Sequence, residues 1–200
     1  GNDALVRVGL QAGYIELPFD VVNDNNRRLE ISPSLAVPYW AYGSETSIPS
    51  LQQIKEQIDD YLEENVRDCL FSMEAFQETY DLIEKSELAA NTEIVQSKVI
   101  FNLHWDVEIR SKSGEIITEV VDHVAESPVK LKNVYTVARA VVEKEMDTLK
   151  LEDITQDLIA LEHPDVPVAG MELSCSKKKW EVEKVKNTLL ELVRLNIHEL

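Results

Sequence analysis

The sequence predicts an α+β protein in which an antiparallel sheet, with a central hairpin at about residues 98–125, packs against several amphipathic helices. Residues 99–110 alternate apolar and polar side chains, which is the pattern of a strand with one buried face. From residue 50 onward, apolar side chains recur at steps of three or four, as in an amphipathic helix. Predicted strands and helices are grouped rather than strictly alternating, which favours α+β over a doubly wound parallel sheet.

The chain is long enough to form one domain with a hydrophobic core. It has 200 residues, of which 44% are hydrophobic, and it shows no internal repeat. We therefore expect a single domain over residues 1–200, with a possible subdivision near residue 90 and another near residue 165.

The first forty residues indicate short extended segments at residues 5–10, 13–17 and 35–42. Between them, residues 21–28 contain the run Asn-Asp-Asn-Asn-Arg-Arg and predict a surface loop. The third segment holds an aromatic cluster, and its members are Tyr39, Trp40 and Tyr42. Such a cluster lines a binding groove or anchors a core, and the core is the favoured interpretation.

A long helix is predicted from Ser50 to about residue 73. Ser50 and Gln53 have the spacing of a capping box, in which each side chain bonds the other residue's backbone N–H. The apolar face consists of Leu51, Ile54, Ile58, Leu62, Val66, Cys69 and Met73. The acidic residues expected to face solvent are Glu56, Asp59, Asp60, Glu63 and Glu64. Cys69 is therefore expected to point inward.

A second helical stretch is expected at residues 74–85, before the predicted hairpin. The turn of the hairpin lies at residues 111–114, where Gly114 suits a position of positive φ, and residues 115–125 return as the partner strand. Further helices are expected at residues 133–149, 154–161 and 182–193, with an extended segment at residues 171–176. The apolar side of the first of these helices consists of Val134, Val137, Ala138, Val141 and Val142.

Two histidines and a carboxylate give the chain its one candidate polar site. His104 and Asp106 share the outer face of the predicted strand, and His123 lies on its hairpin partner, beside Asp122. Such a group binds a divalent metal or forms an acid–base pair when the register brings the imidazoles together. A solvated sheet face is the favoured interpretation, so we expect no metal site. Without a nucleophile elbow or a phosphate-binding glycine motif, we also expect no cofactor and no catalytic activity.

The charge of the chain argues against polyanionic partners. Asp and Glu total 37 against 20 for Lys and Arg, so the net charge is −17. Nucleic acid and anionic membrane surfaces are repelled by such a protein. No apolar stretch approaches the roughly 18 residues that a membrane-spanning helix requires.

The two cysteines, Cys69 and Cys175, lie in none of the spacings that zinc or redox motifs use. Both a long-range disulfide and two buried free thiols fit the composition. A bridge that closes a loop of about a hundred residues stabilises a protein by roughly 4.7 kcal/mol in the chain-entropy model.

Three segments together resemble an uncharacterised family of archaeal cell-surface proteins. They are residues 9–15 (GLQAGYI), residues 37–40 (VPYW) followed by the helix that ends at Cys69, and residues 170–175 (GMELSC) leading to Trp180. The resemblance implies an ectodomain fragment of a longer protein, which is held at the cell surface by an N-terminal pilin-like hydrophobic anchor absent from this chain. It also implies an oxidising compartment and favours Cys69 and Cys175 as disulfide partners, with each other or with cysteines elsewhere.

Three functional classes follow from these patterns. The first is a non-enzymatic extracytoplasmic or pilin-like domain that acts through protein partners or self-association. The alternative is an exported ligand-binding or hydrolytic domain, with Tyr39, Trp40 and Tyr42 as its groove and His104 and His123 at its polar end. A cytoplasmic acidic adaptor is the third class, and it requires free thiols.

Overall fold

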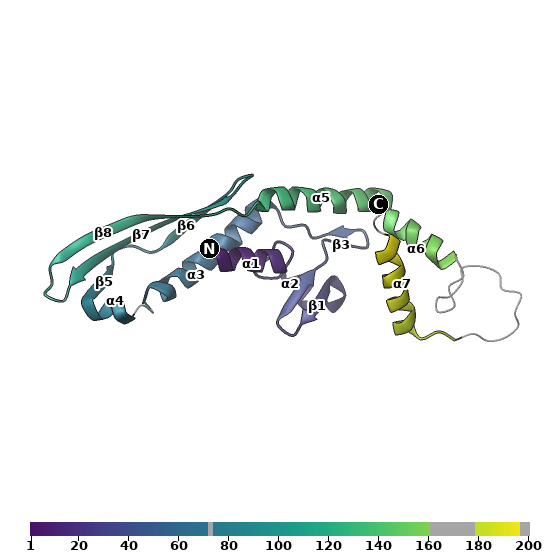
Figure 1. Ribbon diagram of the computed structural model, residues 1–200, viewed down its shortest axis with the longest axis horizontal. Helices are drawn as coiled ribbons and strands as arrows, with labels where there is room; N and C mark the ends of the chain where they lie inside the picture. The colour runs from purple at the N-terminus through teal and green to yellow at the C-terminus, as the bar shows by residue number, and fades with distance from the viewer. Residues whose placement is uncertain (72–73, 161–178, 197–200) are drawn as a thin grey trace, which may run out of the picture. The chain divides into compact units, whose positions relative to one another are not determined.

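A computed structural model of the chain describes residues 1–71, 74–160 and 179–196 (Figure 1). The chain divides into two compact units, Gly1–Ala140 and Val141–Leu200, and each is described by itself. The division falls within the helix α5 (Leu131–Thr148). Helices and antiparallel sheets make up the fold, so the predicted α+β class is confirmed.

The first unit holds all the described strands and most of the helices. Its helices are α1 (Asn2–Leu10), α2 (Phe19–Asn23), the 3-10 helix η1 (Asn25–Arg27), α3 (Leu51–Phe71), α4 (Glu74–Thr79) and the first turns of α5. Its strands are β1 (Arg28–Ser32), β2 (Leu35–Pro38), β3 (Ala41–Tyr42), β4 (Glu45–Thr46), β5 (Tyr80–Glu84), β6 (Ala89–Ile94), β7 (Val99–Ser111) and β8 (Ile116–Ser127). The second unit adds α6 (Lys150–Ala160) and α7 (Val182–Asn196).

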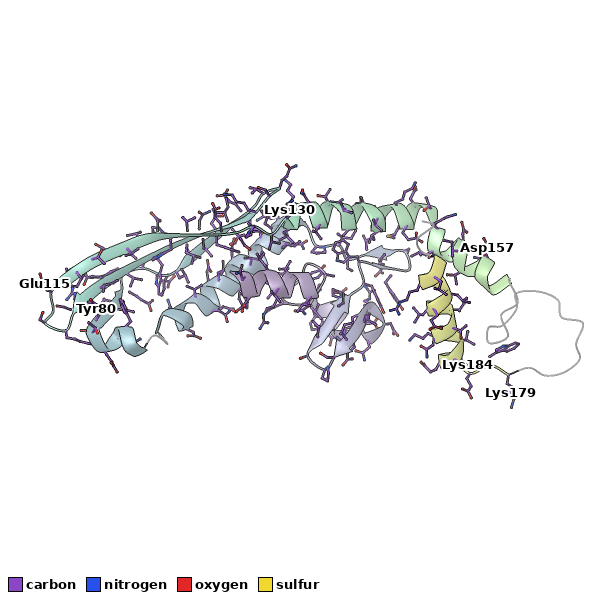
Figure 2. The ribbon with its side chains drawn as sticks, in the orientation of Figure 1. Tyr80, Glu115, Lys130, Asp157, Lys179 and Lys184 are labelled. Atoms are coloured by element: carbon purple, nitrogen blue, oxygen red, sulfur yellow. The ribbon has the colours of Figure 1, made fainter. Side chains whose placement is uncertain are left out.

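The main sheet is built around β7, the strand that the sequence predicts most clearly. β8 pairs antiparallel along one edge of β7, while β6 and β5 pair with successive parts of the other edge. The predicted hairpin is confirmed, and Gly114 takes the expected positive φ of 90° in its turn. Figure 2 marks Glu115 at the tip of this hairpin. Two short ribbons, β1–β2 and β3–β4, complete the strands of the unit.

The core of the first unit lies between α1, α3 and the sheet. The residues buried there include Ala4, Leu5 and Val8 of α1, Ile54, Ile58 and Leu62 of α3, and Val99 and Phe101 of β7. The predicted capping box starts α3: the Ser50 N–H donates to Gln53 Oε1 at 2.8 Å, and the Gln53 N–H donates to Ser50 Oγ at 3.1 Å. The helical period of α3 therefore marks its buried face correctly.

One acidic side chain of α3 departs from the predicted solvent face. Asp59 is only 9% exposed, because its carboxylate turns toward β6 and accepts a hydrogen bond from the backbone N–H of Thr92. Glu63, one turn later, is exposed and accepts a bond from the Ala90 N–H at 2.8 Å. The two carboxylates join the helix to β6, a strand that the sequence analysis did not predict.

The N-terminal prediction was wrong. The segment at residues 5–10 belongs to the helix α1 rather than to a strand, because Ala4, Leu5 and Val8 bury one helical face against α3. Residues 13–17 form turns and bends. In the third segment, β2 and β3 confirm extended structure on either side of Tyr39 and Trp40.

The predictions for the later helices and strands are correct in part. The helix expected at residues 74–85 ends at Thr79, and the chain continues as β5. In the second unit, α6 and α7 confirm the two expected helices. The extended segment predicted at residues 171–176 lies outside the described residues. None of the described helices combines the length and the apolar character that crossing a bilayer requires.

Candidate functional site

The aromatic cluster predicted at Tyr39, Trp40 and Tyr42 does not form one group. Trp40 is half-buried and packs against the core, whereas Tyr39 and Tyr42 are 40% and 45% exposed. The indole N–H of Trp40 donates a hydrogen bond to the carbonyl oxygen of Ala12 at 2.7 Å. The Trp40 ring meets the Tyr135 ring edge to face, with centroids 6.0 Å apart. Core packing is thus confirmed for Trp40 alone.

An apolar groove of about 320 Å³ opens beside Trp40, and we call it the Trp40 groove. Its walls come from α1, the turn that follows α1, α3 and the first turns of α5. Six of its lining residues are Val8, Gly13, Trp40, Ile54, Val134 and Tyr135. The surface that they form accepts apolar side chains, because it is lined mainly by aliphatic and aromatic carbon.

The turn that forms one wall of the groove is tightly constrained. Gly13 has a φ of +93°, and a Cβ at this position would lie 2.7 Å from the Pro49 side chain. Gln57 Oε1 accepts hydrogen bonds from the N–H groups of Ile15 at 2.9 Å and Glu16 at 3.1 Å, which ties the turn to α3. This wall is therefore held in place before any partner binds.

Apolar surface continues from the groove onto α5. Val134, at the groove, is 65% exposed, and Val137, one helical turn later, is 64% exposed. Residues three apart on a helix are neighbours on its surface, so the two side chains form one row. Tyr135 is only 8% exposed, which shows that a different face of α5 packs against the core. Three of the five residues predicted for the apolar side of this helix, Val134, Val137 and Val141, are thus exposed.

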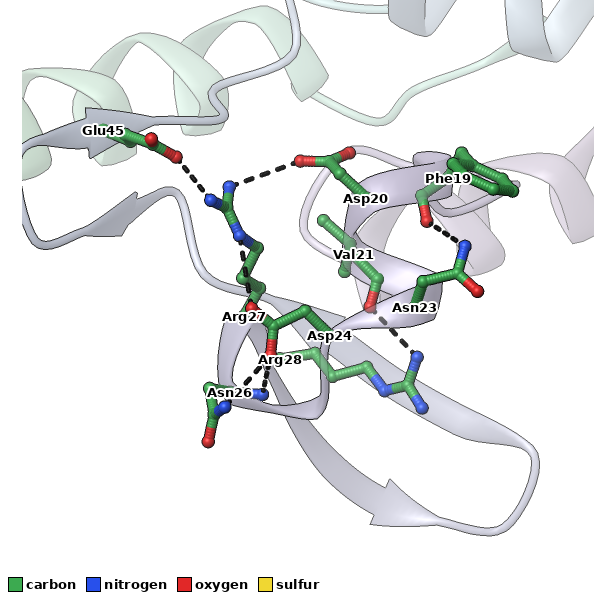
Figure 3. A network of polar contacts seen from close by, with 9 residues as sticks. All are labelled: Phe19, Asp20, Val21, Asn23, Asp24, Asn26, Arg27, Arg28 and Glu45. Atoms are coloured by element: carbon green, nitrogen blue, oxygen red, sulfur yellow. Dashed lines mark hydrogen bonds and ion pairs between the residues drawn. The ribbon is translucent and has the colours of Figure 1, made fainter.

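Tyr42 lies beside a separate, polar cluster centred on Arg27. Figure 3 shows Arg27 and the acidic residues around it. The guanidinium of Arg27 contacts carboxylate oxygens of Asp20 at 3.4 Å, Asp24 at 3.5 Å and Glu45 at 2.5 Å. It also lies 5.8 Å from the centre of the Tyr42 ring. Hydrogen bonding to Glu45 and the charges of all three acids raise the Arg27 pKa above its usual range. This cluster links α2, η1 and β4, and one arginine among three carboxylates leaves it with an excess of negative charge.

The predicted histidine site is spread over two faces of the sheet. The register pairs His104 with Asp122 and Leu103 with His123, so the two imidazoles belong to alternate positions of the ladder. His104 Nδ1 lies 3.0 Å from Asp122 Oδ1, and His123 Nε2 lies 3.2 Å from the carbonyl oxygen of Trp105. Among the described residues, no three His, Cys, Asp or Glu side chains are arranged to hold a metal ion.

Asp106 belongs instead to a group of carboxylates that the sequence pattern does not predict. Glu108 lies opposite Glu119 in the ladder, and Asp106 is close enough to Glu119 to affect the pKa of its carboxyl group. Glu108 is buried and paired: Lys85 Nζ lies 3.2 Å from Oε2, and Arg110 Nε contacts Oε1. These bonds, the Arg110 bond first, lower the pKa of Glu108. Only the register brings the acids together, so no pattern along one strand reveals the group.

The pKa of Glu119 shifts in the opposite direction. Hydrogen bonding to Asp106 and the charge of Asp106 raise it, with smaller contributions from desolvation and from the charge of Glu108. An exposed acid therefore lies next to two other acids on the outer face of the sheet. A cation near Glu119 would favour the ionised form of its carboxyl group.

The second unit has an apolar groove of its own, of about 940 Å³, along α7. Trp180, Val185, Leu189 and Val193 line it, with Lys186 at its polar side. Trp180 is 38% exposed. Cys175 and the side chain of Cys69 lie outside the described part of the chain, and so does the loop with His163.

No known family model matches the chain, and neither the curated proteins nor the solved structures include a similar protein. The likeness to archaeal cell-surface proteins therefore stays a prediction from the sequence. The first unit presents two candidate functional surfaces, the Trp40 groove and the β7–β8 ladder.

Proposed function

We propose that this chain is a non-enzymatic, extracytoplasmic domain that acts through protein contacts, and that the Trp40 groove is one contact surface. One observation carries the proposal: Val134 and Val137 are more than 60% exposed beside a groove that is itself apolar. Contiguous apolar surface on a domain that carries a net charge of −17 marks a binding surface rather than ordinary solvent-facing structure.

The partner we favour presents an amphipathic helix. Val134 and Val137 form a row along α5, and such a row packs into the spaces between side chains of a second helix. The groove beside the row accepts one or two aliphatic side chains from that helix, since about 320 Å³ is small for a drug-sized ligand. Gly9 supports close approach, because no atom lies within 4 Å of the position its Cβ would occupy.

The contacts of the histidines weigh against the alternative function. A ligand-binding or hydrolytic site needs Tyr39, Trp40 and Tyr42 in one pocket with His104 and His123. Trp40 lines the groove, Tyr42 contacts Arg27, and each histidine bonds within the β7–β8 ladder. These contacts favour a domain that binds proteins.

Photo-crosslinking tests the proposed contact surface. A photoreactive amino acid replaces Val137 in the full-length protein in its own cells, and the same residue replaces the exposed Val22 of α2 in a matched control. We expect one protein to crosslink from position 137 and not from position 22. Adding Ala138→Arg, which places a charge in the groove, should abolish that product while circular dichroism and melting temperature stay unchanged. Equal crosslinking from both positions would contradict a contact at the groove.

Export is a separate part of the proposal, and thiol chemistry tests it. Cys69 and Cys175 in an oxidising compartment form disulfides, with each other or with other cysteines of the parent protein. We expect the mass of protein purified without reductant to show no alkylation of either cysteine until a reductant is added. Two thiols that react at once in protein from the native compartment would favour the cytoplasmic adaptor.

A further inference from the structure

Among the residues that the structure describes, no strand pairs with the outer edge of β8. β8 runs from Ile116 to Ser127, twelve residues, and pairs with β7 along one side only. Figure 1 shows it at the margin of the main sheet, with no described strand beyond it. An edge strand presents a row of backbone N–H and C=O groups without ladder partners. Most strands have about five or six residues, so this edge is long.

The side chains of β8 favour pairing with another strand. The strand contains no Pro, Gly or Lys, which are the residues that commonly protect such edges. β-Branched residues fill half of it, and three of them are more than half exposed: Ile116, Ile117 and Val124. Two register shifts interrupt the ladder with β7, and a regular stretch remains at residues 122–127. Residues 122–127 are therefore regular enough to pair with a further strand.

The charges of β8 indicate what kind of partner strand can pair with its outer edge. Its carboxylates are Glu119, Asp122 and Glu126, and the strand carries no Lys or Arg. Lys98 Nζ pairs with Glu126 at 2.6 Å, and His104 pairs with Asp122. Glu119 faces Glu108 across the ladder, and Glu108 is already paired with Lys85 and Arg110, whereas Asp106 acts on Glu119 as a further negative charge. A second copy of this chain would add more acid to the edge, whereas a basic strand would neutralise it.

We propose that the outer edge of β8 is a docking site for an extended, basic segment of a partner protein, which adds a strand to the main sheet. Backbone hydrogen bonds supply the affinity, and lysines or arginines next to Glu119 supply the preference for a basic segment. This surface is separate from the Trp40 groove and goes beyond the function proposed for it.

A synthetic peptide of alternating valine and lysine is the probe. Its binding to the whole chain is measured by fluorescence anisotropy, and the amides that become protected from hydrogen exchange are identified by NMR. Two control peptides are matched to it: one has glutamate in place of lysine, and the other has alternate backbone amides methylated. We expect only the unmodified basic peptide to bind and to protect amides of β8.

Charge reversal locates the contact. Glu119→Lys should weaken peptide binding about fivefold, because it replaces attraction by repulsion at an exposed charge. Glu30→Lys, on the exposed strand β1, makes the same change in net charge and should leave binding unchanged. Three results would overturn the assignment: equal loss in both variants, equal binding of the methylated peptide, or self-association of the free chain that protects β8. The last would identify a second copy as the occupant.

Discussion

The carboxylate of Asp59 accepts a hydrogen bond from the backbone N–H of Thr92 at 2.6 Å, and this contact joins α3 to β6. Thr92 is fully buried and Asp59 nearly so. Lys55 Nζ, one turn earlier in α3, lies 3.3 Å from the second carboxylate oxygen. The buried charge therefore has both a donor and a counter-ion, which is the condition under which burying a carboxylate is tolerated.

Removing this carboxylate should destabilise the first unit. Asp59→Ala leaves the buried Thr92 N–H without its partner, and we expect the free energy of unfolding to fall by about 2 kcal/mol. The neighbouring Asp60 is exposed, so Asp60→Ala should change stability by less than about 0.5 kcal/mol. Urea unfolding of the three proteins measures the difference. A similar, small effect of both substitutions would show that the Asp59–Thr92 contact contributes little.

The elements predicted correctly from the sequence are those with a long, regular pattern. α3 follows its apolar period and its capping box, and the β7–β8 hairpin follows from alternation and Gly114. β5 is short and shows no clear period of two. In β6 the less exposed positions alternate, but they include the polar Thr92, so the sequence does not show the period. The segment at residues 5–10 is a short apolar run, and such a run fits both the two-residue period of a strand and the 3.6-residue period of a helix. Contact with α3 decides its conformation, and that contact is tertiary.

The candidate surfaces show the same limit. Trp40 was singled out by composition, but the groove beside it is completed by Gly13, Ile54 and Tyr135, which come from three other parts of the chain. The partners of Asp106 depend on register, and a single strand contains no information on register. Residue type therefore suggests which side chains can take part in a site, while topology decides which of them meet.

Two glycines near the Trp40 groove should respond to alanine with opposite signs. Gly13 has positive φ and no space for a Cβ, so Gly13→Ala should lower the free energy of unfolding by more than about 1 kcal/mol. Gly9 lies in α1 with open space around it, so Gly9→Ala should raise stability by about 0.5 kcal/mol. Thermal and urea unfolding of both variants test the pair. Stabilisation by Gly13→Ala would contradict the constrained turn.

Glu108 should make the free energy of unfolding depend on pH in the acidic range. Its pKa is lowered in the folded state by Arg110 and Lys85, so it stabilises the fold above its ordinary pKa of 4.5. That stability is lost as the pH falls through the lowered value. We expect Glu108→Gln to be less stable than the parent chain at neutral pH and to lose less stability on acidification. Glu115→Gln, at the exposed hairpin tip, is the control and should follow the parent chain at each pH.

Glu119 should show the opposite dependence. Asp106 raises its pKa in the folded state, so the folded protein binds a proton more tightly there than the unfolded chain does. The stability associated with this proton is present below pH 4.5 and is lost as the pH rises through the raised value. Glu119→Gln removes the ionising group, and the variant should be more stable than the parent chain at neutral pH. This advantage should disappear in acid.

Urea unfolding of Glu119→Gln and of the control Glu30→Gln at several pH values separates this effect from a general change in charge. Both substitutions remove one negative charge from an exposed strand, but only Glu119 lies beside Asp106 and opposite Glu108. A lower stability of Glu119→Gln at neutral pH would mean that the ionised carboxylate is stabilised where it lies. The excess of acid that we expect a basic strand to neutralise at β8 would then be absent.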